Sequence, residues 1–432
     1  MSKKYLAWRD EVVKPRIAVT LPMSDDWAVT ATCGTAEIVT TGTGTLVNVD
    51  VSSYGTWNIS AESDNYEAIA QNITITKSQV YSLHLGLGGV YGVEWDKTSN
   101  PQMSRTDEAL LFSDPVPYVL GASSYGSPFD NIYPWSGMEV VEDEDCGTMV
   151  KIPKFYFKLE NDTTFRLQIT DSPTQGFSTS PAPADRGDGS GEREYVYVSR
   201  YHCSEADYKS RTGAIPKASI TRATARTNIH ALGSDVWQYD YAMLVTIWML
   251  YLVEFANWNS QTKIGYGCGN GSAKEAVGAS DTMPYHTGTM QSSRTTYGVG
   301  VQYRHIEGLW DNCYDWCDGI YYSGTSVYAI KTPSNFSDAT NGTLIGTRPD
   351  ANGYPTDVFV PTAAGFEGYM HTCGTGGGST TYICDYLYVG GVVLCVGGYY
   401  YQGASHGLFY LGGGYSTGGA GTYVGCRLQK LP

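Results

Sequence analysis

Short runs of alternating apolar and polar residues fill the chain from about residue 16 to residue 87. Alternation with a period of two places apolar side chains on one face of a strand, and the polar residues between the runs are typical of turns. The pattern predicts strands at 17–21, 27–31, 45–49, 55–59, 71–75 and 81–85. Strands at such intervals indicate a small all-β sandwich, so we expect a separate domain over residues 16–88.

This predicted sandwich resembles the immunoglobulin-like β-sandwiches that serve as spacer modules on extracellular and virion proteins. Residues 1–15 precede its first strand. Two interpretations of them stay open: an attachment or oligomerisation arm, or a frayed terminus. They contain no apolar core and no small-residue cleavage site of the secretory type, so no signal peptide is expected.

A different pattern begins after Gly88 and Gly89. Apolar runs at 149–157 and 195–201 predict strands, and the stretch 172–191, rich in Pro, Ser, Gly and Asp, predicts a loop. Between Asp240 and Trp258 apolar residues recur every three to four positions, which predicts a helix capped by the Asp240 side chain. Beyond it the chain is glycine-rich, and we expect loop-dominated structure around a modest sheet.

Charge and composition narrow the classes of partner. The formal net charge of -15 leaves no basic surface for nucleic acid and disfavours an anionic membrane surface. The longest apolar run, 243–253, is too short to span a bilayer and is better explained as a buried helix. The chain has 35 Tyr against 11 Phe. Because tyrosine combines a large contact area with a polar tip, this excess favours recognition over catalysis.

The most informative segment is the C-terminal one. An apolar run at 392–398 is followed by Tyr399, Tyr400, Tyr401 and a series of Ser, His, Gly and Tyr residues, and the chain closes at 424–428. Aromatic residues on glycine-punctuated turns between apolar anchors are typical of a binding surface. The alternative is that these tyrosines simply cover a glycine-rich sheet.

Together these segments resemble the C-type-lectin-like fold in its formylglycine-generating-enzyme-like branch, specifically the variable proteins of diversity-generating retroelements carried by phages and prophages. The resemblance covers residues 105–432 and implies an α+β fold. It depends on the segments 150–156, 198–201, 254–261 and 306–319, and most specifically on 403–410 and 425–428.

In that family, error-prone reverse transcription changes asparagine codons into codons for many residues, while neighbouring anchor positions stay fixed. The resemblance implies a variable region at 392–428, with Tyr400, Leu408, Phe409 and Tyr410 as anchors. The residues that it marks as ligand-binding are Tyr399, Tyr401, Gln402, Ser405, His406, Gly412, Gly414, Tyr415, Gly419, Gly421 and Tyr423.

No catalytic or metal-binding constellation is expected. The enzymes of the resembled branch hold copper with a close pair of C-terminal cysteines, whereas this tail contains only Cys395 and Cys426. Cys313 and Cys317 would make an incomplete zinc site, so we expect buried thiols. The segment 310–312 is similar to part of a lectin calcium motif, but its Glu-Pro-Asn companion is missing, which favours a structural role. We therefore expect no cofactor and no enzyme activity.

The sequence hypothesis is a phage receptor-binding protein at a tail-fibre tip, made in the host cytoplasm and carried on the virion. The expected ligand is a host cell-surface protein or glycan. A homotrimer, contacts with other virion proteins through the N-terminal region, no nucleic acid and no membrane insertion complete this hypothesis. Two alternatives stay open: a cellular diversified ligand-binding protein of a bacterium or archaeon, and a copper-dependent formylglycine-generating-type oxidase.

Overall fold

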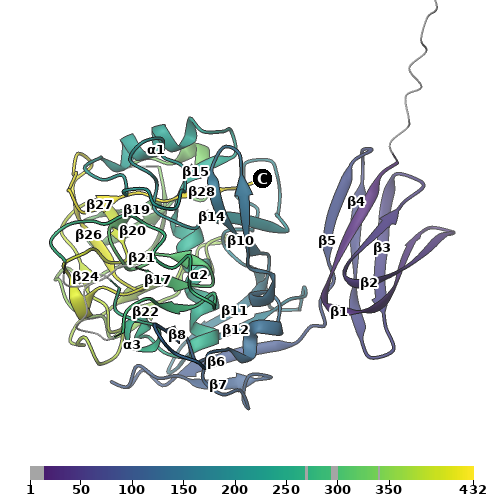
Figure 1. Ribbon diagram of the computed structural model, residues 1–432, viewed down its shortest axis with the longest axis horizontal. Coiled ribbons are helices and arrows are strands. Elements are labelled where there is room, and N and C mark those ends of the chain that lie inside the picture. The colour runs from purple at the N-terminus through teal and green to yellow at the C-terminus, as the bar shows by residue number, and fades with distance from the viewer. Residues whose placement is uncertain (1–13, 268–270, 293–299, 339–340) are drawn as a thin grey trace, which may run out of the picture. The chain divides into compact units, whose positions relative to one another are not determined.

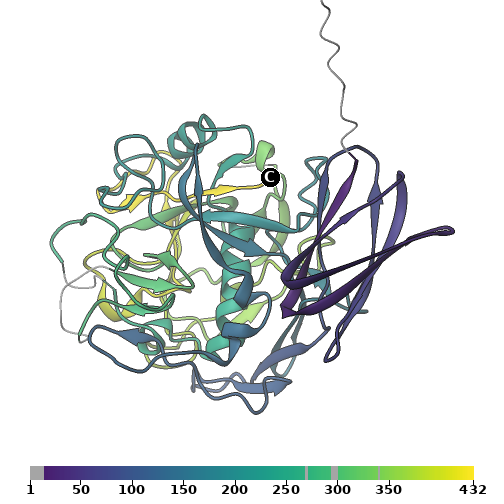
Figure 2. The same ribbon diagram turned by 45° about the vertical axis from the view of Figure 1, so that its right-hand side comes forward.

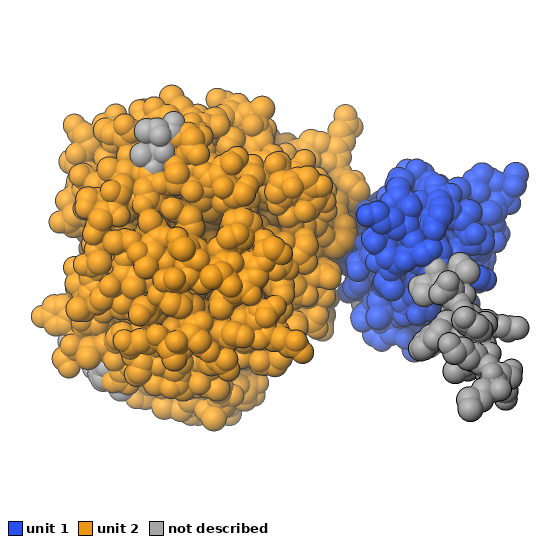
Figure 3. All heavy atoms as spheres, turned by 90° about the horizontal axis from the view of Figure 1, so that it is seen from above, with its two compact units in different colours: residues 1–89 blue, residues 90–432 orange. Residues whose placement is uncertain are grey.

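The computed structural model describes residues 14–267, 271–292, 300–338 and 341–432 (Figure 1). The chain divides into two compact units, Met1–Gly89 and Val90–Pro432, which we call the N-terminal and C-terminal units (Figure 3). Apart from Lys14 and Pro15, the proposed N-terminal arm lies outside the described residues.

The N-terminal unit is a five-stranded sheet in the order β2-β1-β3-β4, with β5 paired in parallel to β1 (Figure 1). Alternate side chains of these strands enclose a core that includes the buried Trp27 and Trp57. The strands are β1 (Arg16–Cys33), β2 (Ala36–Asp50), β3 (Gly55–Glu62), β4 (Glu67–Ile75) and β5 (Val80–His84).

Strand β1 corrects one detail of the sequence prediction. The strands expected at 17–21 and 27–31 form one long strand, because both halves pair with β2. The polar residues between them produce a register shift between Thr20 and Asp25 rather than a turn. At this irregularity the strand changes its second neighbour: residues 16–20 pair with β5 and residues 28–32 pair with β3.

The C-terminal unit is built around helix α2 (Tyr241–Phe255), which confirms the predicted helix (Figures 1 and 2). The Asp240 carboxylate caps it by accepting a 2.9 Å hydrogen bond from the backbone N–H of Met243. All of its residues are buried, as expected for a helix that is apolar on every side. It contacts β6, β12 and β19, so it lies between separate sheets. Two shorter helices are α1 (Arg222–His230) and α3 (Ser260–Lys263).

Two five-stranded sheets of the C-terminal unit come from its N-terminal part and from the end of the chain. The first, β15-β28-β14-β10-β9, comprises β9 (Glu139–Asp143), β10 (Gly147–Pro153), β14 (Tyr195–Ser199), β15 (Val236–Gln238) and β28 (Leu428–Lys430). The second, β13-β11-β12-β6-β7, comprises β6 (Val90–Trp95), β7 (Ser104–Asp107), β11 (Tyr156–Asn161), β12 (Phe165–Thr170) and β13 (Ser178–Thr179). The strand expected at 149–157 is thus divided between β10 and β11, which belong to different sheets.

The remaining sheets carry the C-terminal segment. The largest has the order β21-β20-β19-β25-β26-β24, with β27 paired to β19. Its strands are β19 (Tyr314–Ser323), β20 (Ser326–Ala329), β21 (Thr343–Thr347), β24 (Leu387–Tyr388), β25 (Val393–Val396), β26 (Leu411–Tyr415) and β27 (Val424–Gly425). Smaller sheets contain β8 (Tyr118–Val119), β16 (Gly288–Thr289), β17 (Val301–Tyr303) and β18 (Ile306–Glu307), and the pair β22 (Asp357–Phe359) and β23 (His371–Cys373). Four 3-10 turns complete the elements: η1 (Pro128–Asn131), η2 (Trp135–Gly137), η3 (Pro333–Asn335) and η4 (Gly403–Ser405).

The expected α+β class, with a C-type-lectin-like second domain, is wrong. Strands account for 40% of the structure and helices for 10%, and the sheets are mostly of the sandwich or barrel type. The resemblance implied that class, whereas the glycine-rich sequence beyond α2 forms many short strands. None of the helices in the described part of the chain is long and apolar enough to cross a membrane.

Candidate functional site

Strand β25 fixes the start of the C-terminal segment. All four of its residues are buried, and it lies between β19 and β26 in the largest sheet. The chain then turns at Gly397, whose backbone has a φ of +78°. A Cβ at Gly397 would lie 2.2 Å from the carbonyl oxygen of Leu309, so only glycine fits there. The apolar run expected to anchor the segment is therefore a central strand.

The next anchor is the turn that contains Leu408. Asp385 accepts hydrogen bonds from the backbone N–H groups of Gly407 (2.6 Å) and Phe409 (2.9 Å). The indole of Trp248, on α2, donates a 2.8 Å hydrogen bond to the carbonyl of Leu408. Burial raises the pKa of Asp385 to about 7, although the two N–H groups act in the opposite direction. These contacts fix the turn to the core of the unit.

Between these anchors the segment borders a cavity of about 520 Å³, which we call the tyrosine cavity. Among the described residues that line it, none is charged, and tyrosine is the commonest type. Its lining consists of Tyr314, Tyr354, Tyr386, Tyr388, Tyr399, Gln402, Ser405, His406, Tyr410, Gly412, Gly414, Tyr415 and Tyr423. A neutral, aromatic lining suits a ligand without net charge.

Ring stacking gives one wall of the tyrosine cavity its shape. Tyr314 and Tyr410 stack with centroids 5.1 Å apart, and Tyr399 lies 4.9 Å from Tyr314. Tyr399 in turn stacks on Tyr423 at 4.6 Å. Tyr314 and Tyr410 are buried, whereas Tyr399 and Tyr423 are half-buried. The wall therefore has a buried inner pair of rings and an outer pair that a ligand can reach.

His406 lines the cavity next to this wall. Its ring centroid lies 3.9 Å from that of Tyr410, and its Nδ1 lies 2.7 Å from the Ser405 hydroxyl oxygen. Burial lowers the pKa of His406 to about 3, because the charged imidazolium would lose its hydration. The histidine is therefore neutral near pH 7 and adds no charge to the cavity.

Beside the outer ring of Tyr423 the cavity is lined by Tyr415, at the end of β26. Its ring meets the buried Trp316 edge to face, with centroids 5.1 Å apart. Burial raises the pKa of the Tyr415 phenol, so it stays protonated and can donate a hydrogen bond. Near the outer wall, the Gln402 amide donates a 3.0 Å hydrogen bond to the Tyr399 hydroxyl. The polar groups around the cavity are thus neutral donors and acceptors.

The structure gathers eight of the eleven residues expected to bind ligand around one cavity. The other three lie elsewhere: Tyr401 is 67% exposed, and Gly419 and Gly421 belong to the turn after β26 without lining the cavity. The eight cavity residues are Tyr399, Gln402, Ser405, His406, Gly412, Gly414, Tyr415 and Tyr423.

Several cavity residues were missed by the sequence prediction. Tyr354, Tyr386 and Tyr388 come from outside the variable region, and Tyr354 meets Tyr386 edge to face at 5.0 Å. A signal for two of them was present, because Tyr386 and Tyr388 flank the buried Leu387 and therefore point to the same side of a strand. Tyr410 was expected as an anchor, and no role was predicted for Tyr314.

The glycines of the expected site differ in the room around them. A Cβ at Gly412 would lie 2.6 Å from the Cys395 sulfur and 2.9 Å from the Tyr410 ring. At Gly421 the nearest atoms, in the Tyr423 ring, would be 3.3 Å away. Gly412 therefore cannot accept a side chain without displacing buried atoms, whereas Gly421 can accept a small one.

The cysteines expected as buried thiols are free in the structure. Cys317 lies on strand β19 rather than at a helical spacing from Cys313, and burial raises the pKa of both thiols. Cys395 donates a hydrogen bond to the Gly412 carbonyl, and burial also raises its pKa. Copper(I) binds thiolates, which these surroundings disfavour. In the described parts of the chain, no three His, Cys, Asp or Glu residues are grouped so that they could hold a metal ion. Cys268 lies outside the described residues.

The segment 310–312 has the hydrogen bonds of a structural element. The Asp311 carboxylate accepts from the backbone N–H groups of Gly300 (2.8 Å) and Val301 (3.2 Å). The Asn312 amide exchanges two hydrogen bonds with the backbone of Glu275. These oxygens are thus used within the fold.

The chain matches no protein-family model and none of the curated proteins. Its function must therefore be argued from the cavities and from the chemistry of their linings. The tyrosine cavity defines the candidate site because it brings distant tyrosines together with the C-terminal segment.

Proposed function

We propose that this chain is a ligand-binding protein whose C-terminal segment recognises a molecule on a host cell surface, as a receptor-binding protein at the tip of a phage tail fibre. The observation that carries the proposal is the tyrosine cavity, because most of the residues expected to bind ligand line it. In this proposal the chain acts by binding alone and has no enzyme activity.

The lining of the tyrosine cavity supports recognition of a neutral group. Tyrosine rings offer dispersion contacts to the apolar face of a sugar or to a protein side chain, and their hydroxyls can donate or accept hydrogen bonds. With no charged residue among the described lining, an ionic group would lose hydration without gaining an ion pair. A neutral glycan or an uncharged patch of a host protein is therefore the proposed ligand.

The proposal includes diversification of the segment 392–428 by a retroelement. Half-exposed positions such as Tyr399, Tyr415 and Tyr423 could change with the ligand, while Gly412 would stay fixed for lack of room. A near-identical, asparagine-rich repeat close to the gene would support this part of the proposal. If the DNA close to the gene holds no such repeat, diversification is refuted, but the proposal that the chain binds a ligand still stands.

Location on a virion, trimer formation and attachment to other virion proteins through the N-terminal region belong to the same proposal. Several copies on one particle would raise the effective affinity, because the second and later contacts are intramolecular. Modest affinity at each tyrosine cavity would therefore suffice for adhesion.

The test compares adhesion to host cells by the wild type and by the double variant Tyr399→Ala, Tyr423→Ala. Removing the stacked outer rings should weaken binding at least tenfold, since a central aromatic is worth about 1–4 kcal/mol. The matched control is Tyr54→Ala, which removes a 58% exposed ring from the N-terminal unit. Undiminished adhesion by a folded double variant would refute the proposal, as would equal losses in both variants.

A further inference from the structure

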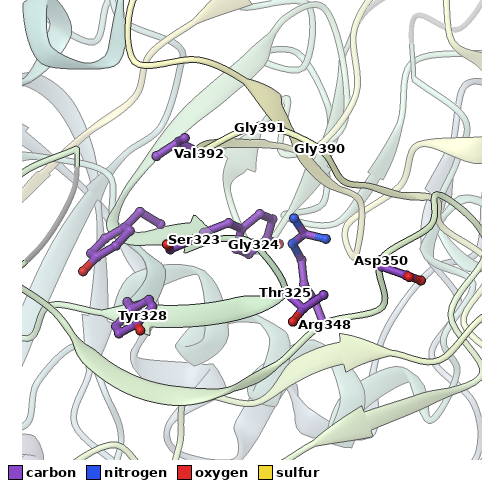
Figure 4. A pocket seen from close by; sticks show the side chains of 11 residues that line it. Ser323, Gly324, Thr325, Tyr328, Arg348, Asp350, Gly390, Gly391 and Val392 are labelled. Carbon is purple, nitrogen blue, oxygen red and sulfur yellow. The ribbon is translucent and has the colours of Figure 1, made fainter.

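A second cavity, of about 730 Å³, lies on the largest sheet and is distinct from the tyrosine cavity. Its walls are the hairpin of β19 and β20, the residues that follow β21 and the segment 390–392 (Figure 4). Among the residues that the structure describes, none lines both cavities. We call it the arginine cavity, because Arg348 is its only cationic residue among those described. Its volume is in the range typical of small-molecule sites.

Arg348 is held in place by one backbone contact and two side-chain contacts. Its backbone N–H donates a 2.9 Å hydrogen bond to the carbonyl of Thr325, and Nη1 donates a 2.7 Å hydrogen bond to the carbonyl of Pro349. The guanidinium lies over the ring of Tyr322, 4.6 Å from its centroid. Tyr322 is itself fixed by a 2.8 Å hydrogen bond between its hydroxyl and Nε2 of His371. The cation is thus oriented before any ligand arrives.

Arg348 lacks the partner that buried arginines have elsewhere in this unit. It is only 7% exposed, its Nε is buried without a hydrogen-bond partner, and no carboxylate of the described residues lies at ion-pair distance. By contrast, the buried Arg186 pairs with Asp240 and the buried Arg427 pairs with Asp315. The charge of Asp350 favours the cation but does not offset its burial, which lowers the pKa of Arg348, so an anion in the arginine cavity would stabilise it.

The remaining lining specifies the rest of the ligand. The side chains of Ser323 and Thr325 are exposed at the hairpin turn, and neither makes a hydrogen bond within the described part of the chain. The half-buried ring of Tyr328 lies on one side of Arg348, and the exposed carboxylate of Asp350 lies on the other (Figure 4). Hydroxyls and an aromatic ring suit a polyhydroxylated ligand, whereas Asp350 would repel a second negative charge.

We infer that the arginine cavity binds a sugar that carries a single carboxylate, with the carboxylate on the Arg348 guanidinium. A guanidinium presents two parallel N–H donors to a carboxylate, and a fixed guanidinium loses little conformational entropy when it does so. This site is independent of the tyrosine cavity, whose lining favours neutral groups.

The test is calorimetric titration of the full chain with methyl β-D-glucuronide and with its neutral counterpart, methyl β-D-glucoside. The glucuronide should bind at least tenfold more tightly than the glucoside. Arg348→Gln should abolish this preference, and Arg348→Lys should reduce it, because an ammonium keeps the charge but loses the paired donors. Inorganic sulfate, a dianion, should bind more weakly than the glucuronide.

Asp350→Asn is a second test variant that should stay folded, because it changes an exposed side chain. It should strengthen glucuronide binding by about threefold at low salt, as expected for removal of one nearby like charge. Tyr399→Ala, in the other cavity, should leave glucuronide binding unchanged. Equal binding of the two glycosides, no glucuronide binding at millimolar concentration, or a preference retained by folded Arg348→Gln would each overturn the inference.

Discussion

Replacement of Arg427 by methionine should severely destabilise the frame that carries the C-terminal segment. The Arg427 guanidinium is fully buried and joins three parts of the chain. It donates to the Asp315 carboxylate (3.0 Å) and to the carbonyl oxygens of Ser199 (2.7 Å) and Glu307 (2.7 Å). Methionine has a similar length but none of these donors.

The size of the effect follows from what the variant leaves behind. Among the described residues Asp315 would keep His202 as its side-chain partner, at 2.9 Å, and the carbonyls of Ser199 and Glu307 would lose the donor that Arg427 supplies. Breaking one side of a buried ion pair costs about 3–5 kcal/mol, which is a large part of the ~5–15 kcal/mol that stabilises a typical domain. We therefore expect a loss of at least about 3 kcal/mol at pH 8.

The loss should be smaller at pH 5 than at pH 8. Burial by itself would raise the pKa of Asp315, but the charges of His202 and Arg427 lower it below its ordinary value. In the wild type the stability that this lowered pKa contributes is fully present at both pH 5 and pH 8, because both lie above the ordinary pKa of the carboxyl, and it is lost only at lower pH. Without Arg427 one of the two cations that lower the pKa of Asp315 is gone, so burial raises this pKa in the variant, and uptake of a proton at pH 5 reduces the cost of the buried carboxylate.

Urea unfolding followed by tryptophan fluorescence measures this loss at both pH values. The matched control is Arg211→Met, which removes a 54% exposed side chain paired with Asp207 on the surface. Such a pair is worth about 0–1 kcal/mol. The reasoning is refuted if Arg427→Met lowers the free energy of unfolding by no more than Arg211→Met does. It is also refuted if Arg427→Met lowers it more at pH 5 than at pH 8.

Two further predictions concern the neighbourhood of the tyrosine cavity. Gly412→Ala should cost about 1–3 kcal/mol by overpacking against Cys395, whereas Gly421→Ala should change the free energy of unfolding by less than about 1 kcal/mol; equal values in urea unfolding would contradict the difference in room. Because burial raises the pKa of Asp385 to about 7, its carboxyl costs stability as the pH rises from 4 to 7. The free energy of unfolding of Asp385→Asn, relative to that of the wild type, should therefore rise by about 3 kcal/mol between pH 5 and pH 8. A difference that does not change with pH would show that the carboxyl titrates normally.

Local periodicity explains which elements could be predicted from the sequence. The apolar residues of α2 recur at helical spacing and Asp240 can cap them, so both ends of the signal lie within one short window. The division of 149–157 into β10 and β11 could not be foreseen, because the apolar run continues through both strands, whereas β10 pairs with β9 and β11 pairs with β12 in a different sheet. The fold class failed for the same reason, since short strands depend on partners that local patterns do not identify.

The candidate site shows the same limit. The residues contributed by the C-terminal segment lie close together in sequence, and an excess of tyrosine on glycine-rich turns marked them. Tyr354 reaches the same cavity through its tertiary contact with Tyr386, which local sequence patterns do not predict. The arginine cavity gave no sequence signal at all, because an unpaired arginine is recognisable only when its surroundings are known.

The two cavities would select ligands by contact rather than by long-range attraction. With a formal net charge of -15, the chain repels anions at a distance, and this repulsion weakens as salt is added. A carboxylate would therefore reach Arg348 against the overall field and bind only through short-range contacts with the oriented guanidinium. For the tyrosine cavity, whose described lining is neutral, the field has little effect on either approach or binding. Added salt should consequently favour association at the arginine cavity while it weakens the bound ion pair, whereas recognition by the tyrosine cavity should depend little on salt.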